Sequence, residues 1–552
     1  MQTAIDTVSS IAHQLGSPHS FVDSNEDHIP LSSNGARELK FPPDFVWGTA
    51  TASYQVEGGC DAGGRGLSIW DTFSRERCVD NGDVACGHFF KYEEDVKLMQ
   101  KLGFKNYRLS ISWSRIQPTG RGPINAEGVA FYNDLINCLL AHGVEPLITL
   151  YHWDLPQALE DELGGWQSRE IAPIFCDYAR LCFELFGDRV KNWLTFNEPW
   201  CVCLLGYGTG EHAPGITCDD GTKVYMAAHN VLRAHAAAVD VYRREYKAQQ
   251  GGVIGITLNC NWNEPVPDRD PAAAQRNADA AHRILMWSLG WFADPIWRGD
   301  YPPEMRERCG DRLPTFTDEE KALLKGSSDF LGLNHYFSDF VKDCSKGEFV
   351  SHWGITSKGG YFGDMAATTE GHPTWARTDM GWNVVPWGFR RLLLWCQERY
   401  NPPGGIYITE NGCAVPEPTK ESSVKDTFRV AYLTSYIAAM HEAMEAGADV
   451  RGYFAWSFLD NFEWSLGYSK RFGIVHVDYD TLERTPKTSA HWFAHVTARN
   501  AVHIEAGARF TDAATALSHV DADDVAAVVA VAAAPCPLAA ADPTAAATMV
   551  AA

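Results

Sequence analysis

The sequence is short of positive charge. Its 552 residues contain 47 Lys and Arg against 70 Asp and Glu, a formal net charge of −23 at pH 7. A surface of this sign repels the phosphates of nucleic acids and anionic lipid headgroups, so we expect no nucleic-acid partner and no membrane partner. A neutral small-molecule substrate is compatible with this charge, because it experiences little of the field.

Membrane-spanning and targeting segments are not recognisable either. No stretch approaches the roughly 20 apolar residues that span a bilayer. Residues 1–36 contain four acidic residues and no Lys or Arg, whereas secretory signals begin with basic residues and transit peptides are basic and poor in acid. The 15 cysteines are odd in number and form no CxxC pair, which favours free thiols and no zinc site. We therefore expect a cytoplasmic protein.

Composition divides the chain into three parts. Residues 1–38 are polar and show no helical or strand periodicity, which predicts a flexible N-terminal extension. Residues 501–552 are rich in Ala and contain several Pro, which is typical of a low-complexity tail. Residues 39–500 form one continuous unit between them.

Within this unit, apolar runs rich in β-formers alternate with amphipathic stretches, as in parallel strands joined by crossover helices. One stretch carries Tyr92, Val96 and Met99 on a single helical face, and another spans 426–446. An open doubly wound sheet is the alternative, but its GxGxxG phosphate turn is missing. Eight strand–helix repeats predict a single (β/α)8 TIM barrel, with the active site at the C-terminal ends of the strands. The eight runs are residues 45–53, 106–113, 145–152, 190–197, 252–259, 330–336, 405–410 and 450–456.

Two of these runs lead into a glutamate. Glu198 follows the fourth run and Glu410 ends the seventh, so a barrel would place both at its mouth. There, burial can keep one carboxyl protonated while neighbouring dipoles keep the other ionised. Cleavage of a glycosidic bond requires such a pair. The alternative is that each glutamate only caps or salt-bridges the rim.

The other strand ends carry side chains suited to a sugar. The hydroxyls of a pyranose need hydrogen-bond donors and acceptors, and its apolar face packs on an aromatic ring. The polar and aromatic residues at these positions are Gln55, His152, Asn197, Asn334, Tyr336, Trp456, Glu463 and Trp464.

Five motifs carry a resemblance to a known family. They are FVWGTATASYQVEG (45–58), YHWDLP (151–156), TFNEP (195–199), ITENG (408–412) and WSFLDNFEW (456–464). Over about residues 39–497 the chain resembles the β-glucosidases of glycoside hydrolase family 1.

The resemblance implies a retaining β-glucosidase that removes terminal non-reducing β-D-glucosyl residues by double displacement, without a metal or organic cofactor. Glu410 matches the nucleophile that forms a covalent glycosyl-enzyme, and Glu198 matches the acid/base. Tyr336 would orient Glu410, and Asn197 would bind the 2-hydroxyl. The remaining substrate contacts would come from Gln55, His152, Glu463 and Trp464 at the other hydroxyls, Trp456 beneath the ring and Trp382 on the aglycone side.

Single residues of this chain distinguish between the kinds of enzyme found in the family. Plant thioglucosidases have Gln where this chain has Glu198, so an O-glycosidase is favoured. The Glu463 carboxylate would repel a phosphate, which disfavours 6-phosphorylated sugars. The loop disulfide of many plant relatives is not supported, because Cys218 has no nearby partner. Glucose is the expected donor, while galactosides and fucosides remain open.

Three other functions are alternatives. A non-catalytic sugar-binding barrel would lack one of the two glutamates, and both are present. A transglycosidase uses the same two glutamates, with an alcohol or second sugar in place of water. An inverting hydrolase needs the two carboxyl groups farther apart.

Overall fold

A computed structural model describes residues 37–344, 349–350, 356–357 and 360–504. The predicted N-terminal extension and Ala-rich tail therefore lie almost entirely outside the described residues. Fourteen cysteines fall within them, and all fourteen are free. Within this same part of the chain, no helix has both the length and the apolar character needed to cross a membrane.

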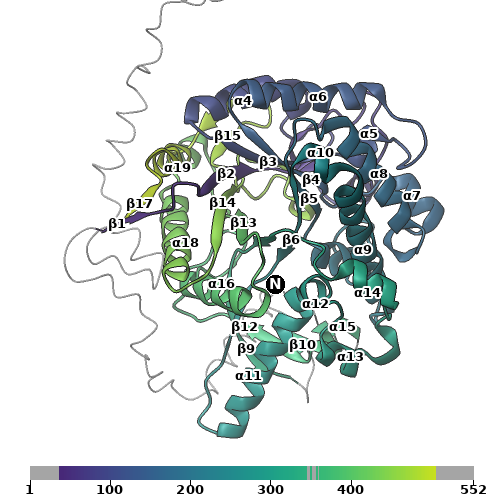
Figure 1. The fold of residues 1–552 in the computed structure, drawn as a ribbon. Coiled ribbons are helices and arrows are strands. Elements are labelled where there is room, and N and C mark those ends of the chain that lie inside the picture. The colour runs from purple at the N-terminus through teal and green to yellow at the C-terminus, as the bar shows by residue number, and fades with distance from the viewer. Residues whose placement is uncertain (1–36, 345–348, 351–355, 358–359, 505–552) are drawn as a thin grey trace, which may run out of the picture.

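Eight parallel strands close into a barrel at the centre of the molecule (Figure 1). They follow one another in chain order, and β14 pairs back onto β2. Each predicted run overlaps one strand of the barrel, so the predicted TIM barrel is confirmed. The strands are almost wholly buried, as in parallel sheets covered by helices. They are β2 (Val46–Ala50), β3 (Asn106–Ser110), β4 (Glu145–Tyr151), β5 (Asn192–Asn197), β6 (Val253–Asn259), β8 (Leu331–Asn334), β13 (Ile406–Asn411) and β14 (Val450–Trp456).

Helices surround the barrel (Figure 1), and each of the longer helices has buried apolar residues. The predicted face of residues 88–102 behaves in this way, because Val96 and Met99 are fully buried while Tyr92 is half-buried. The longer helices are α4 (His88–Leu102), α6 (Ala126–Ala141), α8 (Ile171–Phe186), α9 (Thr222–Val241), α11 (Pro271–Leu285), α16 (Pro386–Tyr400), α18 (Thr427–Glu445) and α19 (Thr488–Arg499).

Short helices occupy the connections. The α-helices are α2 (Ser53–Val56), α3 (Ile69–Arg77), α5 (Trp113–Ile116), α7 (Gln157–Leu163), α10 (Lys247–Gln250), α12 (Trp291–Arg298), α13 (Pro303–Cys309), α14 (Asp318–Leu324), α15 (Gly360–Met365) and α17 (Lys420–Val424). The 3₁₀ and π turns are η1 (Gly165–Gln167), η2 (Cys201–Leu205), η3 (Tyr242–Tyr246), η4 (Met286–Gly290), η5 (Gly310–Arg312) and η6 (Trp464–Leu466).

Four predicted strands, the runs at 45–53, 106–113, 145–152 and 330–336, were too long at their C-terminal ends, and the first two had the largest excess. The run at 45–53 leaves the sheet after Ala50, because the Ser53 N–H bonds to the Ser110 side chain and Ser53 already begins α2. The run at 106–113 ends at Ser110 and turns into α5. Both strands are therefore followed by short helices at the mouth of the barrel.

The connections after β6 and β8 build a small additional sheet that the sequence did not predict. It contains β7 (Trp262–Pro265), β9 (Ser338–Asp343) and β12 (Ala367–Glu370), and it lies beside α11 (Figure 1). Two two-stranded ribbons are also present: β10 (Phe349–Val350) with β11 (Thr356–Ser357) in the connection after β8, and β15 (Val475–Val477) with β16 (Arg484–Pro486) after β14.

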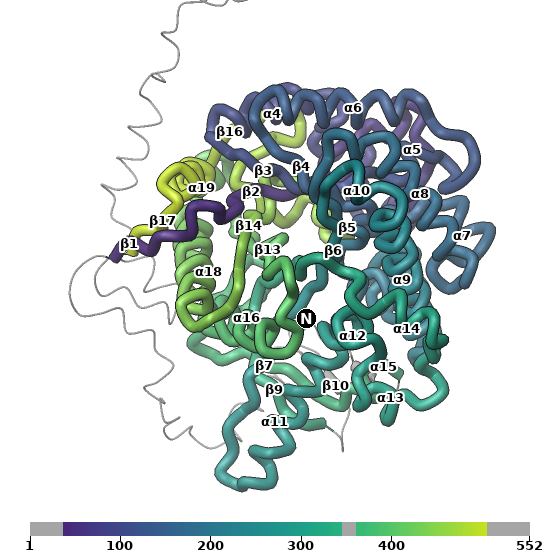
Figure 2. Tube along the Cα trace, viewed as in Figure 1, coloured from purple at the N-terminus to yellow at the C-terminus, as the bar shows by residue number. Residues whose placement is uncertain are grey.

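The two ends of the described chain form a pair of hydrogen-bonded strands. β1 (Arg37–Lys40) pairs antiparallel with β17 (Ala501–Ile504), and the purple and yellow ends lie side by side in Figure 2. The boundary expected at residues 38/39 falls within β1, and the boundary expected at 500/501 lies at the start of β17.

Candidate active site

Two buried glutamates lie at the C-terminal ends of two barrel strands, β5 and β13, which are separated by β6 and β8. Glu198 directly follows β5, and Glu410 is the penultimate residue of β13. Only 7% of Glu198 and 3% of Glu410 is exposed. Both glutamates therefore occupy the strand-end positions that the sequence predicted for them.

Glu410 is held by two strong donors. The Arg108 guanidinium donates from Nη1 to Oε1 at 2.5 Å, and the Tyr336 hydroxyl donates to Oε2 at 2.6 Å. Hydrogen bonds and a cation of this kind stabilise the ionised carboxylate. Burial and the neighbouring carboxylates raise the pKa of Tyr336 well above its usual value, so the phenol stays protonated and remains a donor. The hydrogen bond expected between Tyr336 and Glu410 is present.

Arg108 was not predicted to belong to the site. It lies on β3, is almost completely buried, and also donates from Nη2 to Oδ1 of Asn197 at 2.7 Å. A third bond reaches the backbone carbonyl of Thr409. The signal was available, because a charged residue within the apolar run 106–113 needs a buried partner.

Glu198 has a different environment. Asn334 donates from Nδ2 to its Oε1 at 2.7 Å, and the Cys201 thiol donates to its Oε2 at 3.0 Å. Burial and the nearby charge of Glu410 outweigh these bonds and raise the pKa of Glu198 to about 7. The backbone of Glu198 has a φ of 47°, which an ordinary side chain rarely adopts and which is common at functional sites.

A hydrogen-bond chain fixes the amide of Asn197. Its Oδ1 accepts from Arg108 and from Nδ2 of Asn334, so its Nδ2 is left to donate to Nε2 of His152 at 2.9 Å. His152 must then carry its proton on Nδ1. Burial and the Arg108 charge lower the pKa of His152 well below its usual value, so the ring is neutral.

Several polar atoms at this end of the barrel are buried without a hydrogen-bond partner among the described residues. Gln55 uses its amide nitrogen on Asn461 and on the Phe462 carbonyl, which leaves Oε1 unpaired. Nδ1 of His152 and Oε2 of Glu463 are unpaired as well. Buried polar groups normally have partners, so these atoms are suited to binding a ligand rich in hydroxyls.

The third carboxyl group of the site, that of Glu463, has a raised pKa. Burial, Glu410 and Glu198 together raise the pKa of Glu463 to about 8. It is therefore mostly protonated near neutral pH. In that form it can donate as well as accept a hydrogen bond.

Aromatic rings complete the site. The His152 ring is roughly parallel to the rings of Trp456 and Trp464, with centroids 6.0 Å apart in each case. The half-buried Trp382 lies against Tyr336 at 5.3 Å between centroids, in the same apolar cluster as Trp456. The structure therefore brings the predicted aromatic residues to the same end of the barrel as the two glutamates.

Comparison with known proteins shows the family of the chain. Residues 37–502 match glycosyl hydrolase family 1. The chain belongs to this family. Beta-glucosidase 4 of Oryza sativa subsp. japonica is 47% identical over 466 residues, covering 82% of this chain and 94% of that protein.

Solved structures of similar proteins match most of the chain as well. A rice beta-glucosidase mutant in a covalent complex with Glc from GA4GE is 43% identical, with a TM-score of 0.78, and the match covers 83% of this chain and 99% of the rice chain. A family 1 β-glucosidase from Thermotoga maritima is 42% identical, with a TM-score of 0.77, and the match covers 84% of this chain and 99% of the other.

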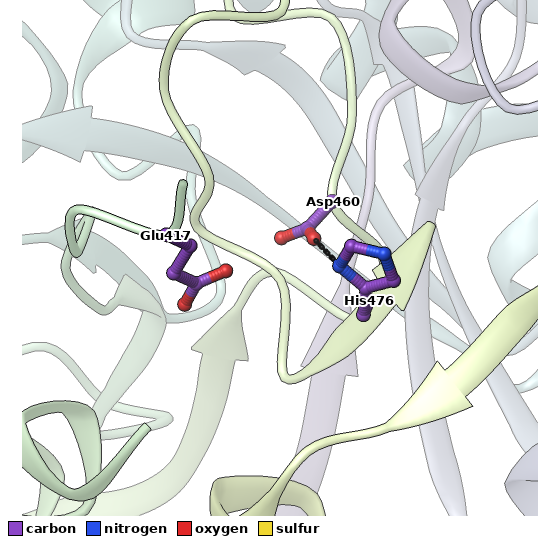
Figure 3. A group of neighbouring side chains, drawn as sticks. All are labelled: Glu417, Asp460 and His476. Carbon is purple, nitrogen blue, oxygen red and sulfur yellow. Dashed lines mark ion pairs between the residues drawn. The ribbon is translucent and has the colours of Figure 1, made fainter. Parts of the chain in front are cut away.

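A second cluster of titratable residues lies behind the loop that follows β14. Glu417, Asp460 and His476 place one ligand atom each within 4.8 Å of one another (Figure 3). Their carboxylates already bind cationic side chains, because Lys487 Nζ lies 2.6 Å from Glu417 and 2.8 Å from Asp460, and Arg429 lies 2.8 Å from Glu417. The cluster in this family 1 barrel is therefore a buried ion network rather than a metal site.

Lys487→Met is expected to lower the free energy of unfolding by about 3–5 kcal/mol, because it leaves two buried carboxylates without their shared cation. Thermal and denaturant unfolding measure the change. Lys420→Met is the matched control, since the Lys420–Glu483 pair is exposed and such pairs contribute at most about 1 kcal/mol. Equal stability of the two variants would contradict the importance of the network.

Proposed function

We propose that this chain is a retaining β-glucosidase, with Glu410 as nucleophile and Glu198 as acid/base. The observation that carries the proposal is the opposite environment of the two glutamates. Glu410 is bound by Arg108 and Tyr336, which favour the carboxylate. Burial next to Glu410 keeps the pKa of Glu198 near 7, so one group is a ready nucleophile while the other can carry a proton.

The first step transfers the glucosyl group to the enzyme. An oxygen of Glu410 attacks the anomeric carbon, and the bond between that carbon and the aglycone oxygen breaks. The proton of Glu198 moves to the departing oxygen, so the aglycone leaves as a neutral alcohol. Asn197 can donate its second amide hydrogen to the 2-hydroxyl, because its other polar contacts are already made by Arg108, Asn334 and His152.

The second step returns the enzyme to its starting state. Glu198, now ionised, takes a proton from water while the water oxygen attacks the anomeric carbon, and the bond to Glu410 breaks. The product is glucose with its configuration retained. The covalent glucose complex of the rice relative supports an intermediate of this kind.

The unpaired polar atoms support a neutral glycoside as substrate. Gln55 Oε1, His152 Nδ1–H and the Glu463 carboxyl offer acceptors and donors for hydroxyls. A phosphate would be poorly accommodated, because Lys470 is already paired with Asp379 at 3.0 Å and so is not a free cation.

A panel of p-nitrophenyl glycosides tests the proposal. We expect the largest kcat/KM on the β-D-glucoside and no turnover of the α-D-glucoside. The 6-phosphorylated β-glucoside should also resist hydrolysis. A preference for β-galactoside or β-fucoside would change the donor sugar but not the mechanism. Absence of turnover on all β-glycosides would contradict the proposal and favour a sugar-binding role.

A further inference from the structure

The Cys201 thiol lies against the carboxyl group of Glu198. Its Sγ is 3.0 Å from Oε2, while Asn334 binds the other oxygen at 2.7 Å. Only 7% of Cys201 is exposed. Each oxygen of Glu198 therefore has its own donor, and one of the two donors is a thiol.

The neighbours of the sulfur fix its role as a donor. Nδ2 of Asn259, at the end of β6, lies 3.7 Å from Sγ and donates to it. The sulfur therefore accepts on one side, and its own hydrogen is directed to Glu198 on the other. Burial and the charges of Glu198 and Glu410 raise the pKa of Cys201 well above its usual value, so the thiol keeps its proton.

The backbone places the thiol at this position. Glu198 adopts a positive φ, and the chain then enters the π-helical turn η2, which begins at Cys201. The Val202 N–H bonds to the Glu198 carbonyl and ties the turn to the glutamate. π-Helical turns are rare and are frequent at functional sites.

We propose that Cys201 is a positioning residue of the active site, whose thiol hydrogen bond orients the Glu198 carboxyl and favours its ionised form. This inference rests on the proposed function, in which Glu198 alternates between acid and base. A donor to the carboxylate opposes burial and the repulsion by Glu410, both of which favour the protonated form. The thiol hydrogen bond therefore increases the ionised fraction of Glu198, and the ionised form is the one that activates water in the second step.

Other groups also act on Glu198 and must be separated from the thiol. Glu410 on β13 disfavours its charge and Arg108 on β3 favours it, while Glu463 after β14 is mostly protonated near neutral pH. Tyr336 and His152 are neutral at working pH, for the reasons given above. None of these groups is on the same turn as Cys201, so a substitution of the thiol leaves them in place.

The test is the pH dependence of kcat/KM in Cys201→Ala. Loss of the donor should raise the pKa of Glu198, so the fall in activity on the alkaline side moves to higher pH by about one unit. Cys201→Ser, which retains a donor, should restore the wild-type profile. Cys201→Val fills the space without donating and should behave as Cys201→Ala does, which covers the case in which the alanine variant does not fold.

Cys203→Ala is the matched control. Cys203 is fully buried on the same turn, so this variant makes an equal truncation away from the carboxyl groups. A purely structural role of Cys201 would lower activity at every pH without moving the profile. An unmoved profile in folded Cys201→Ala and Cys201→Val would overturn the inference.

The infrared S–H stretch provides a readout that does not depend on catalysis. The difference spectrum of wild type minus Cys201→Ala isolates the band of this thiol. At a pH above 7, where Glu198 is mostly ionised, we expect the band to shift when Glu198 is replaced by Gln, because a neutral amide is a weaker acceptor than a carboxylate. A shifted band together with an inactive wild type would remove the proposed function but keep the hydrogen bond, whereas an unshifted band would overturn the thiol's role.

Discussion

Replacement of Glu410 by Ala is expected to lower kcat/KM on aryl β-D-glucosides by about 10⁴-fold or more, since the first covalent step loses its nucleophile. Added azide can enter the space left by the carboxylate and attack the anomeric carbon from the same face. The recovered product should therefore be α-glucosyl azide. Stopped assays with product analysis by NMR measure both the loss and the stereochemistry.

This variant also leaves the buried Arg108 without its carboxylate partner, so loss of folding must be separated from loss of chemistry. Glu410→Gln keeps an acceptor for Arg108 and should be equally inactive while remaining folded. Glu483→Ala, at an exposed position, should keep full activity. Residual activity within tenfold of wild type, or β-glucosyl azide as the rescued product, would refute the assignment of Glu410.

The barrel could be predicted from the sequence because its strands are more apolar than the segments that connect them. β14 was predicted with its correct bounds, Val450–Trp456, since a parallel strand buried on both faces is, apart from the exposed Arg451 near its start, a nearly continuous apolar run. The ends of β2 and β3 were placed too late. There the chain remains apolar while it turns into α2 and α5, and composition cannot separate a buried strand from a buried turn.

The pair of strands β1 and β17 was missed for a different reason. Each has four residues and lies where the composition changes toward the extension and the tail. A short strand of this kind is defined by its partner, which is 461 residues away in the chain for the pair Lys40 and Ala501. Local periodicity contains no information on such a partner.

Most of the predicted site residues lie at strand ends, which is why they could be found together. Arg108 was missed because it lies within β3 and reaches the site through its long side chain. Cys201 depends on the positive φ of Glu198 and on the π-helical turn η2. Neither feature has a periodic signature, so the thiol's contact with Glu198 could be recognised only in three dimensions.

The second large effect is expected at Glu198, and it depends on both pH and leaving group. Glu198→Ala should lower kcat/KM by about 10²–10⁴-fold on alkyl glucosides, whose departing oxygen needs a proton. The loss should be much smaller on 2,4-dinitrophenyl β-D-glucoside, because that phenolate leaves without one. Azide added to this variant should yield β-glucosyl azide, since it attacks the glycosyl-enzyme in place of the activated water.

The pH profile assigns the acid directly. Because the pKa of Glu198 is raised to about 7, the proton needed in the first step is present below that pH and lost above it. Wild-type kcat/KM on alkyl glucosides should fall on the alkaline side of about pH 7, and this fall should vanish in Glu198→Ala.

Glu442 provides a matched control, because burial also raises its pKa to about 7, yet it lies on the outer helix α18. If Glu442→Ala rather than Glu198→Ala removed the alkaline fall, the acid would have to be assigned elsewhere; if neither did, the fall would report a step other than proton transfer from Glu198.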